Sequence, residues 1–350
     1  MTEPRPNVIV EQTSFDDACD DWNRLAARST NVFGTFEWAS TWWRHFGHKR
    51  QPLVVSCRRQ GGELVGLLPL CVSQRGGLRV VRLIGHGPAD ALGPLCAPDD
   101  RPAVAAALSS VLEDVRADIF VGDELPRAEA WSRHLGAAVH GTGSSPVLRL
   151  GGTWDDFLQA RSHNFRQQVR RRERSLARRG LRFRLCEHRD RLHRDLDTLF
   201  ALHGSRWEGG SEFSRLRAFH REFATEAFER GWLRLWFLEA DGNEVAAWYG
   251  LRFGGVDFYY QAGRDPTWDR YAVGFVLLAH SVREAIEDGM NEYRLGRGAE
   301  QYKSRFADHD RELETLVLVR GLKGRLAFAA ADAMPRKTRA RRYLRSALDT

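Results

Sequence analysis

An order of strands and turns that occurs twice along the chain narrows the choice of fold more than any other feature. Residues 53–87 are predicted to form three strands, separated by the turn RRQGGE and the pair Gly76-Gly77. Residues 232–263 repeat this order, with the turn ADGNE and the pair Gly254-Gly255. Asp241-Gly242 is a strong hairpin signal, because a two-residue turn needs positive φ angles that glycine adopts without strain.

Each repeat continues into a loop, a helix and a further strand. The helices are expected at 99–117 and 272–288, followed by strands at 119–125 and 291–298. Three antiparallel strands followed by a helix and a strand make an α+β unit, so we predict two such units in tandem. Each is expected to be a mixed, mostly antiparallel sheet flanked by helices.

The expected units are residues 1–150 and 151–320, followed by a basic tail at 321–350. Helices at 161–179 and 190–207 are predicted to lead into the second unit. The segment HGTGSSP at 140–146 is either a link between the units or the turn before a last strand of the first unit.

Composition and motifs exclude several classes of protein. Of the 350 residues 43% are hydrophobic and 28% are charged, which excludes a disordered chain. No apolar run is long enough to span a bilayer, so we expect a soluble, cytoplasmic protein. The five cysteines form no C-x-x-C pair, and H-E-x-x-H, Walker and serine-triad patterns are missing, so no metal and no redox cofactor is expected.

Positive charge is concentrated in two segments. Residues 161–184 carry ten arginines and one glutamate, and residues 320–350 carry nine Lys or Arg and two Asp. Because the formal net charge is +7, the rest of the chain is acidic. Such segments attract phosphates, nucleic acid or an anionic membrane surface, although solvated helix faces are also commonly charge-rich.

Five short motifs give the chain a family resemblance. They are F-x-T-F-E-W-x-x-x-W-W from Phe33 to Trp43, L-H-x-x-R-W from Leu202 to Trp207, F-Y-Y-Q-A-G ending at Gly263, the helix entry Val273-Gly274, and R-G-A-E-Q-Y-K from Arg297 to Lys303. In this order they resemble the tandem GNAT acyltransferases, namely the CelD-like acetyltransferase group related to the Fem-type aminoacyl transferases. The resemblance implies transfer of an acyl group, usually from acyl-CoA or acetyl-CoA, to an amine.

The resemblance also implies where the donor binds. GNAT proteins hold the CoA pyrophosphate on the backbone amides of a Q/R-x-x-G-x-G/A loop, and the matching segment here has one glycine. Amides at a helix N-terminus bind phosphate without needing every glycine. The expected donor-binding residues are Arg270, Tyr271, Ala272, Val273, Gly274, Phe275 and Lys303. The matching segment of the first repeat, GHGPADALGPLCAPDDRP, is acidic and rich in proline, which has no N–H, so the first unit is predicted to be non-catalytic.

Transfer to an amine needs a base for nitrogen and an acid for the leaving thiolate. Glu300 is the expected base, Tyr302 the expected acid, and His203 an alternative base. A structural reading stays open for each: a carboxylate at a helix start, a packing tyrosine and a buried histidine. The expected substrate-binding residues are Arg166, Arg170, Arg206, Trp207 and Tyr260, although strand alternation alone does not choose between Tyr259 and Tyr260.

The acceptor is expected to be a small-molecule or lipid amine. If it is a lipid, the tail 320–350, with Leu322, Leu326 and Phe328 among its basic residues, is expected to rest on an anionic membrane. The alternative function is peptide-bond formation from aminoacyl-tRNA, as in the Fem group, in which case the basic helix at 161–179 would bind tRNA.

Overall fold

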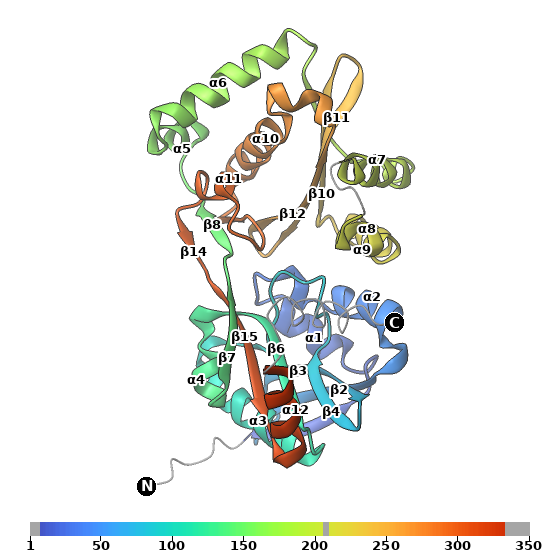
Figure 1. Cartoon of the computed structure of the whole chain (residues 1–350). Coiled ribbons are helices and arrows are strands. Elements are labelled where there is room, and N and C mark those ends of the chain that lie inside the picture. The colour runs from blue at the N-terminus through green and yellow to red at the C-terminus, as the bar shows by residue number, and fades with distance from the viewer. Residues whose placement is uncertain (1–7, 206–209, 333–350) are drawn as a thin grey trace. The chain divides into compact units, whose positions relative to one another are not determined.

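The structure is a computed structural model that describes residues 8–205 and 210–332. The chain divides into two compact units, each built around its own sheet (Figure 1). Unit 1 comprises residues 1–143 and 311–350, and unit 2 comprises residues 144–310. Both sheets are mixed and mostly antiparallel and are flanked by helices, which confirms the predicted α+β tandem fold.

The sheet of unit 1 has the strand order β1-β2-β3-β4-β6-β15-β7, with β5 paired to β3. Within the part of unit 1 that is described, β4 and β6 form the parallel pair, and α3 connects them. The elements are β1 (Val8–Thr13), α1 (Cys19–Ala26), α2 (Phe36–Phe46), β2 (Gln51–Arg59), β3 (Leu64–Arg75), β4 (Leu78–Leu83), β5 (Leu95–Cys96), α3 (Arg101–Asp114), β6 (Ile119–Pro126), α4 (Trp131–Leu135), β7 (Ala138–Gly143), β15 (Leu313–Val319) and α12 (Gly321–Asp332).

The sheet of unit 2 has the strand order β14-β8-β13-β12-β11-β10-β9. Among the described strands of unit 2, β12 and β13 form the parallel pair, and α10 connects them. The elements are β8 (Pro146–Arg149), α5 (Trp154–Ala160), α6 (His163–Ala177), β9 (Arg182–Leu185), α7 (Leu192–Gly204), α8 (Glu212–Arg215), α9 (Arg217–Glu229), β10 (Leu233–Ala240), β11 (Asn243–Phe253), β12 (Val256–Arg264), α10 (Val273–Glu287), β13 (Glu292–Arg294), α11 (Gln301–Ser304) and β14 (His309–Asp310).

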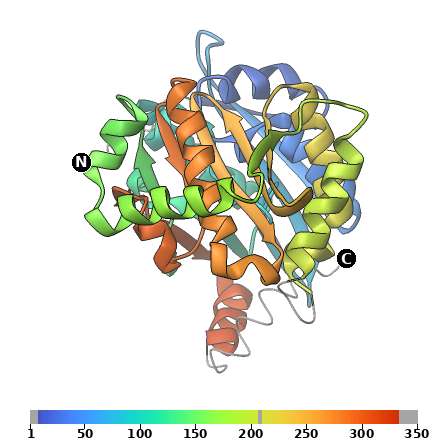
Figure 2. The same ribbon diagram turned by 90° about the horizontal axis from the view of Figure 1, so that it is seen from above.

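The sheet of unit 2 is covered on both faces, with α10 on one and α7 and α9 on the other (Figure 2). The apolar stripe of α10 explains its place: Val276, Leu277, Ala279 and Val282 are all buried in the core that also holds Trp248 and Tyr293 of the sheet. At the β10–β11 turn, Asp241 and Gly242 have φ angles of 49° and 77°, which confirms the predicted hairpin.

The observed division of the chain differs from the expected one. β8 pairs with β13 and β14, so the sheet of unit 2 begins before residue 151. β15 pairs with β6 and β7, so residues 313–319 belong to the sheet of unit 1 rather than to the second unit. The expected tail also begins as a helix, α12, before it leaves the described residues. Within residues 8–205 and 210–332, no helix is long and apolar enough to cross a lipid bilayer.

Candidate active site

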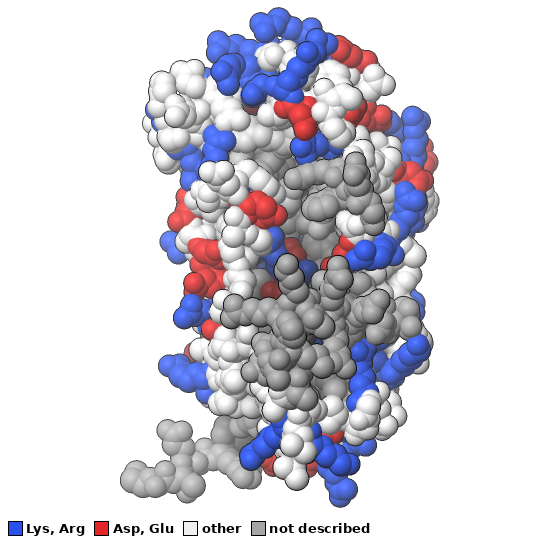
Figure 3. Space-filling view, in the orientation of Figure 1, with Lys and Arg blue, Asp and Glu red and all other residues white. Residues whose placement is uncertain are grey.

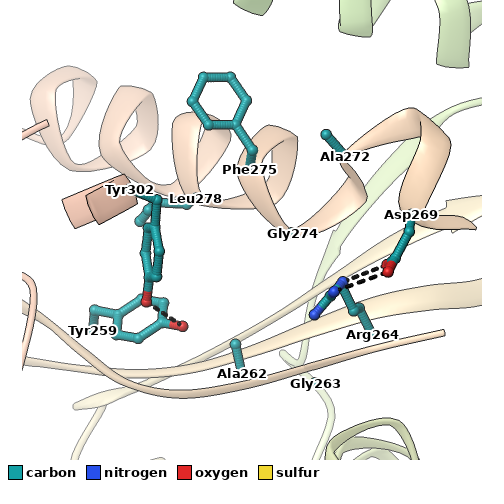
Figure 4. Close-up of a pocket in the computed structure, with 10 residues that line it drawn as sticks. All are labelled: Tyr259, Ala262, Gly263, Arg264, Asp269, Ala272, Gly274, Phe275, Leu278 and Tyr302. Atoms are coloured by element: carbon teal, nitrogen blue, oxygen red, sulfur yellow. Dashed lines mark hydrogen bonds and ion pairs between the residues drawn. The ribbon is translucent and has the colours of Figure 1, made fainter. Parts of the chain in front are cut away.

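A pocket opens in unit 2 where β12 parts from β13. The two strands pair over Val256–Phe258 and Glu292–Arg294, and β12 then runs on to Arg264 past the end of β13. The pocket lies between this part of β12 and the first turns of α10, and its volume is about 360 Å³ (Figure 4). Its lining consists of Tyr259, Ala262, Gly263, Arg264, Asp269, Ala272, Gly274, Phe275, Leu278 and Tyr302.

A β-bulge in β12 decides which side chains face the pocket. The register with β11 shifts between the pairs Tyr249–Gln261 and Gly250–Tyr259, which leaves Tyr260 as the extra residue. Tyr259 and Ala262 therefore both lie on the α10 face, although they are three residues apart. Tyr260 points to the opposite face, where its ring contacts Phe213, His220 and Tyr249. The structure thus corrects the choice of Tyr260: Tyr259 lines the pocket.

The N-terminus of α10 forms one wall of the pocket. Ala272, just before the helix, is left-handed with φ of 54°, and the amide of Val276 donates to its carbonyl at 3.1 Å. The amides of Val273, Gly274 and Phe275 precede this first intrahelical bond, so they are the donors that a helix start leaves for a ligand. A left-handed residue after a helical turn also makes a concave nest of N–H groups that suits an anion.

Only part of the predicted donor-binding segment lines the pocket. Ala272, Gly274 and Phe275 do. The side chain of Val273 is buried in the core. The guanidinium of Arg270 lies 4.7 Å from the ring of Tyr271, and the Arg270 carbonyl accepts a hydrogen bond from Arg172. The structure does not bring the Arg270 or Tyr271 side chains into the pocket, because they pack among themselves on the short helix before α10.

An ion pair that the sequence did not reveal closes the same end of the pocket. Arg264 Nε lies 2.6 Å from Asp269 Oδ1, and Arg264 Nη2 lies 3.1 Å from Asp269 Oδ2 (Figure 4). Both side chains are partly exposed, so a stronger anion at the helix N-terminus can compete with Asp269 for the guanidinium. The pair comes from the end of β12 and the turn after it, and no local motif marks it.

Two tyrosines lie at the other end of the pocket. The hydroxyl of Tyr302 on α11 donates to the hydroxyl of Tyr259 on β12 at 3.3 Å. The loop before α11 is shaped by Gly298, whose φ of 113° is a backbone conformation that residues with a side chain rarely adopt. This loop therefore needs glycine to deliver Tyr302.

Lys303 and Glu300 are bound to each other rather than to the pocket. The side chain of Lys303 is 3% exposed, and its ammonium donates to the carbonyl of Arg297 at 2.5 Å and to Oε2 of Glu300 at 2.9 Å. Burial on these partners leaves Lys303 unable to reach a phosphate, which corrects the prediction that it binds the donor. Glu300 is 54% exposed and stands at the start of α11, as its structural reading expected.

His203 lies on the wrong face of the sheet for a base. Its Nδ1 is 2.8 Å from the carbonyl of Ala262 and its Nε2 is 2.7 Å from the hydroxyl of Ser211, so both ring nitrogens are engaged. A Cβ on Gly263 would lie 2.3 Å from the His203 amide nitrogen, because α7 packs directly on β12 here. The buried-histidine reading therefore holds, and His203 fixes α7 to the back of the pocket strand.

The remaining predicted substrate-binding residues lie away from the pocket or outside the described ranges. Arg166 donates to the carbonyls of Gln159 at 3.2 Å and Arg161 at 2.5 Å, where it ties α5 to α6. Arg170 is exposed on α6. Arg206 and Trp207 lie in the undescribed segment. Arg170 belongs to a group of exposed arginines on α6 and just after it, with Arg171, Arg174 and Arg178. Figure 3 shows cationic side chains gathered over this end of unit 2.

Burial sets the ionisation of two groups of unit 2 that do not line the pocket. The Tyr293 hydroxyl, which is 2.7 Å from Ser281 Oγ, has a pKa raised well above its usual value because it is desolvated. Desolvation likewise lowers the pKa of His280 to about 4, with a smaller contribution from Arg283. Both groups are neutral at pH 7 and act as packing. Among the described residues, no His, Cys, Asp or Glu side chains gather in a group of three that could hold a metal ion.

Comparison with known proteins finds a family model that matches the part of the chain holding this pocket. Residues 163–304 match the family model of the acetyltransferase (GNAT) domain. No curated protein sequence matches the chain.

Solved structures with the same fold cover most of the chain at low sequence identity. FemX is 11% identical with a TM-score of 0.64, and the alignment covers 89% of this chain and 97% of FemX. A C-terminal DUF2156 domain from Agrobacterium fabrum, assigned to a lysylphosphatidylglycerol synthetase, is 13% identical with a TM-score of 0.58 and coverages of 91% and 96%. L-PGS from Bacillus licheniformis is 12% identical with a TM-score of 0.51 and coverages of 84% and 95%.

These neighbours show the fold, and the family model covers every residue that lines the pocket. Residues 163–304 therefore form a GNAT acetyltransferase domain, and the protein is a transferase.

Proposed function

We propose that the pocket of unit 2 binds an acyl-CoA thioester and transfers its acyl group to an amine by direct attack. The observation that carries the proposal is that one cavity is lined both by the N-terminus of α10 and by the hydrogen-bonded hydroxyls of Tyr302 and Tyr259. The helix N-terminus suits an anionic phosphate, and the tyrosine hydroxyls suit a leaving group that needs a proton. The motifs that resemble the CelD-like acetyltransferases agree with this reading.

The donor would lie along β12. Its pyrophosphate would accept from the amides of Val273, Gly274 and Phe275, with Arg264 turning from Asp269 to the phosphate. The amide-rich arm of CoA would follow the edge of β12 beyond Phe258, where its pairing with β13 has ended. The volume of about 360 Å³ is within the range of ligand pockets, ~300–1,000 Å³.

The reaction is a nucleophilic substitution at the thioester carbonyl. The amine nitrogen forms the new C–N bond, the carbonyl oxygen becomes an oxyanion, and the C–S bond breaks as that intermediate collapses. Tyr302 gives its proton to the CoA thiolate and recovers one through Tyr259 from water. The proton lost by nitrogen would pass to water in the pocket, and from there Glu300, which lies outside the pocket on Lys303, would take it. Backbone N–H groups of β12 would stabilise the oxyanion.

Unit 1 is proposed to be non-catalytic, and its own chain supports this. In unit 2, β12 is a single strand that continues to Arg264. Its counterpart in unit 1, β4, ends at Leu83, and beyond it a separate short strand, β5, pairs with β3. The intervening loop buries Ala89 and Leu92, and the amide of Leu92 donates to the carbonyl of Glu124 on β6 at 3.1 Å. α3, the counterpart of α10, begins with Asp100 and Pro102, which disfavour an anion.

A Fem-type reaction, with aminoacyl-tRNA as the donor, is the second candidate. The exposed arginines of α6 favour it, because a row of cations is the feature that phosphate-dominated RNA binding requires. The fold shared with FemX is compatible with both donors.

A thiol-release assay tests the proposal. The full chain is incubated with acetyl-CoA or longer acyl-CoA and a panel of amines, and free CoA thiol is measured. Thiol release that depends on the amine is expected. Calorimetry with no binding of either donor at millimolar concentration, together with a salt-sensitive gel shift of charged tRNA, would replace the proposal with the Fem-type reaction.

A further inference from the structure

The C-terminal helix α12 has one face fixed to unit 1. A Cβ on Gly324 would lie 2.4 Å from the carbonyl oxygen of Asp118, so the helix backbone packs directly on the chain before β6. Phe328, four residues on and therefore on the same side, contacts the ring of His140 with centroids 5.6 Å apart. This contact corrects the expectation that Phe328 faces outward with the two leucines. α12 also contacts β15, as Figure 1 shows.

The opposite face of α12 is apolar and open. Leu322 is 74% exposed and Leu326 is 64% exposed, and their spacing of four residues places them side by side. At 100° per residue they lie about 180° from Gly324 and Phe328, with Lys323 on one flank and Arg325 on the other. Single exposed leucines are common, but a pair in line between two cations is the pattern of a helix that lies in a membrane interface.

Two exposed cations flank this face. Lys323 and Arg325 are both exposed. Beyond the helix, residues 333–350 carry six Lys or Arg, and Asp349 is their one acidic residue in the sequence. Such a run complements an anionic surface and repels a cationic one.

We infer that the outward face of α12 docks on an anionic phospholipid bilayer. Leu322 and Leu326 would enter the boundary between headgroups and acyl chains, while Lys323 and Arg325 would lie at the level of the lipid phosphates. A second copy of the chain fits this face less well. Two leucines are far below the roughly 1,000 Å² of a stable protein interface, and a twofold pair would bring the cations of the two copies together. The inference does not depend on the function proposed for the pocket of unit 2.

Vesicle flotation with the full chain tests the inference. The vesicles are either phosphatidylcholine alone or equal parts phosphatidylcholine and phosphatidylglycerol. The wild type is expected to float with the anionic vesicles and not with the neutral ones, and binding is expected to weaken as salt rises. The double variant Leu322→Ser/Leu326→Ser should bind at least about tenfold less, because the apolar area that enters the interface is lost.

Two variants and one measurement complete the test. Ile9→Ser replaces another exposed apolar residue, on the edge strand β1, and should bind like the wild type. Lys323→Gln/Arg325→Gln should lower the preference for anionic vesicles. The melting temperatures of all variants should match, since the changed side chains are exposed. Wild type that floats with neither vesicle, a leucine variant that binds as well as wild type, or light scattering showing a dimer that this variant dissociates would each overturn the inference.

Discussion

The hydroxyl of Tyr302 donates a hydrogen bond to the hydroxyl of Tyr259, 3.3 Å away, and the two residues come from different elements, α11 and β12. The contact exists because the bulge at Tyr260 turns Tyr259 toward α10 and because Gly298 shapes the loop that delivers Tyr302. Both hydroxyls line the pocket opposite the N-terminus of α10. In the proposed reaction, one end of this cavity would hold the donor phosphate and the other would carry out proton transfer.

The two tyrosines should act as a unit in catalysis. Tyr302→Phe is expected to lower kcat by about a hundredfold, because the thiolate loses its acid, and Tyr259→Phe should have a smaller effect. The double variant should be little worse than Tyr302→Phe alone, since either change breaks the same relay. Steady-state kinetics measures the three values. Additive losses, or losses matched by a fall in melting temperature, would mean that the tyrosines only pack.

Two glycines of the pocket should respond oppositely to alanine. Gly263→Ala places a methyl 2.3 Å from the His203 amide, so α7 must move, and a loss of about 2 kcal/mol in the free energy of unfolding is expected. At Gly274 the nearest atom is Arg264 Cδ at 3.7 Å, so Gly274→Ala should keep stability within about 1 kcal/mol. Its methyl enters the pocket, however, and should weaken acyl-CoA binding. Urea unfolding and calorimetry measure the two effects, and equal behaviour of the two variants would contradict the packing described here.

Lys303 should prove to be a positioning residue. Its ammonium holds Arg297 and Glu300, so Lys303→Met should loosen the loop that carries Tyr302 and lower kcat by about tenfold with little change in the KM for acyl-CoA. Lys49→Met, an exposed lysine of unit 1, is the matched control and should change neither constant. A raised KM at unchanged kcat would instead return Lys303 to phosphate binding.

The His280 ring, whose side chain is 11% exposed, should make stability depend on pH. It stacks on Phe183 at a centroid distance of 3.8 Å, and its pKa is lowered to about 4 from 6.5, first by burial and then by Arg283. As pH falls, His280 of the unfolded chain therefore binds a proton before His280 of the folded chain does. The stability that the neutral ring contributes to the folded state is complete above about pH 6.5 and is lost as pH falls toward 4. The loss between pH 7 and pH 5 is about 2 kcal/mol.

His280→Phe keeps a stacked ring and removes the titrating group. Its unfolding free energy should fall less between pH 7 and pH 5 than that of the wild type, as urea titrations at both pH values would show. Part of the dependence should remain, because burial also holds the pKa of His86 well below 6.5. An unchanged dependence in the variant would mean that His280 is protonated in the folded state.

Local sequence patterns predicted individual hairpins and helices. They did not predict which distant strands pair with each other, and that pairing sets the boundaries of the two units. The Asp241-Gly242 hairpin and the helix from Val273 to Glu287 depend on turn chemistry and periodicity, and both are confirmed. The strand Leu313–Val319 has no feature that names its partners, and it pairs with β6 and β7, nearly two hundred residues earlier. For the same reason the domain boundaries could not be read from composition.

Local motifs likewise predicted some residues of the candidate site, and contacts between distant segments decided the others. Gly274 and Tyr302 were expected to meet in one crevice, and both line the pocket. The choice between Tyr259 and Tyr260 depended on a bulge, which is a property of two paired strands rather than of one. The burial of Lys303 and the engagement of His203 depend on backbone carbonyls, at Arg297 and Ala262, that no side-chain motif records.

Hydrogen exchange of the full chain with and without saturating acetyl-CoA would show which unit binds the donor. Exchange should slow at the amides of 273–275, along 259–264 and at 300–304 when the donor is bound, with no change along 85–101 of unit 1. Exchange that is unaltered at 273–275, or slowed along 85–101 instead, would contradict the assignment of the donor pocket to unit 2.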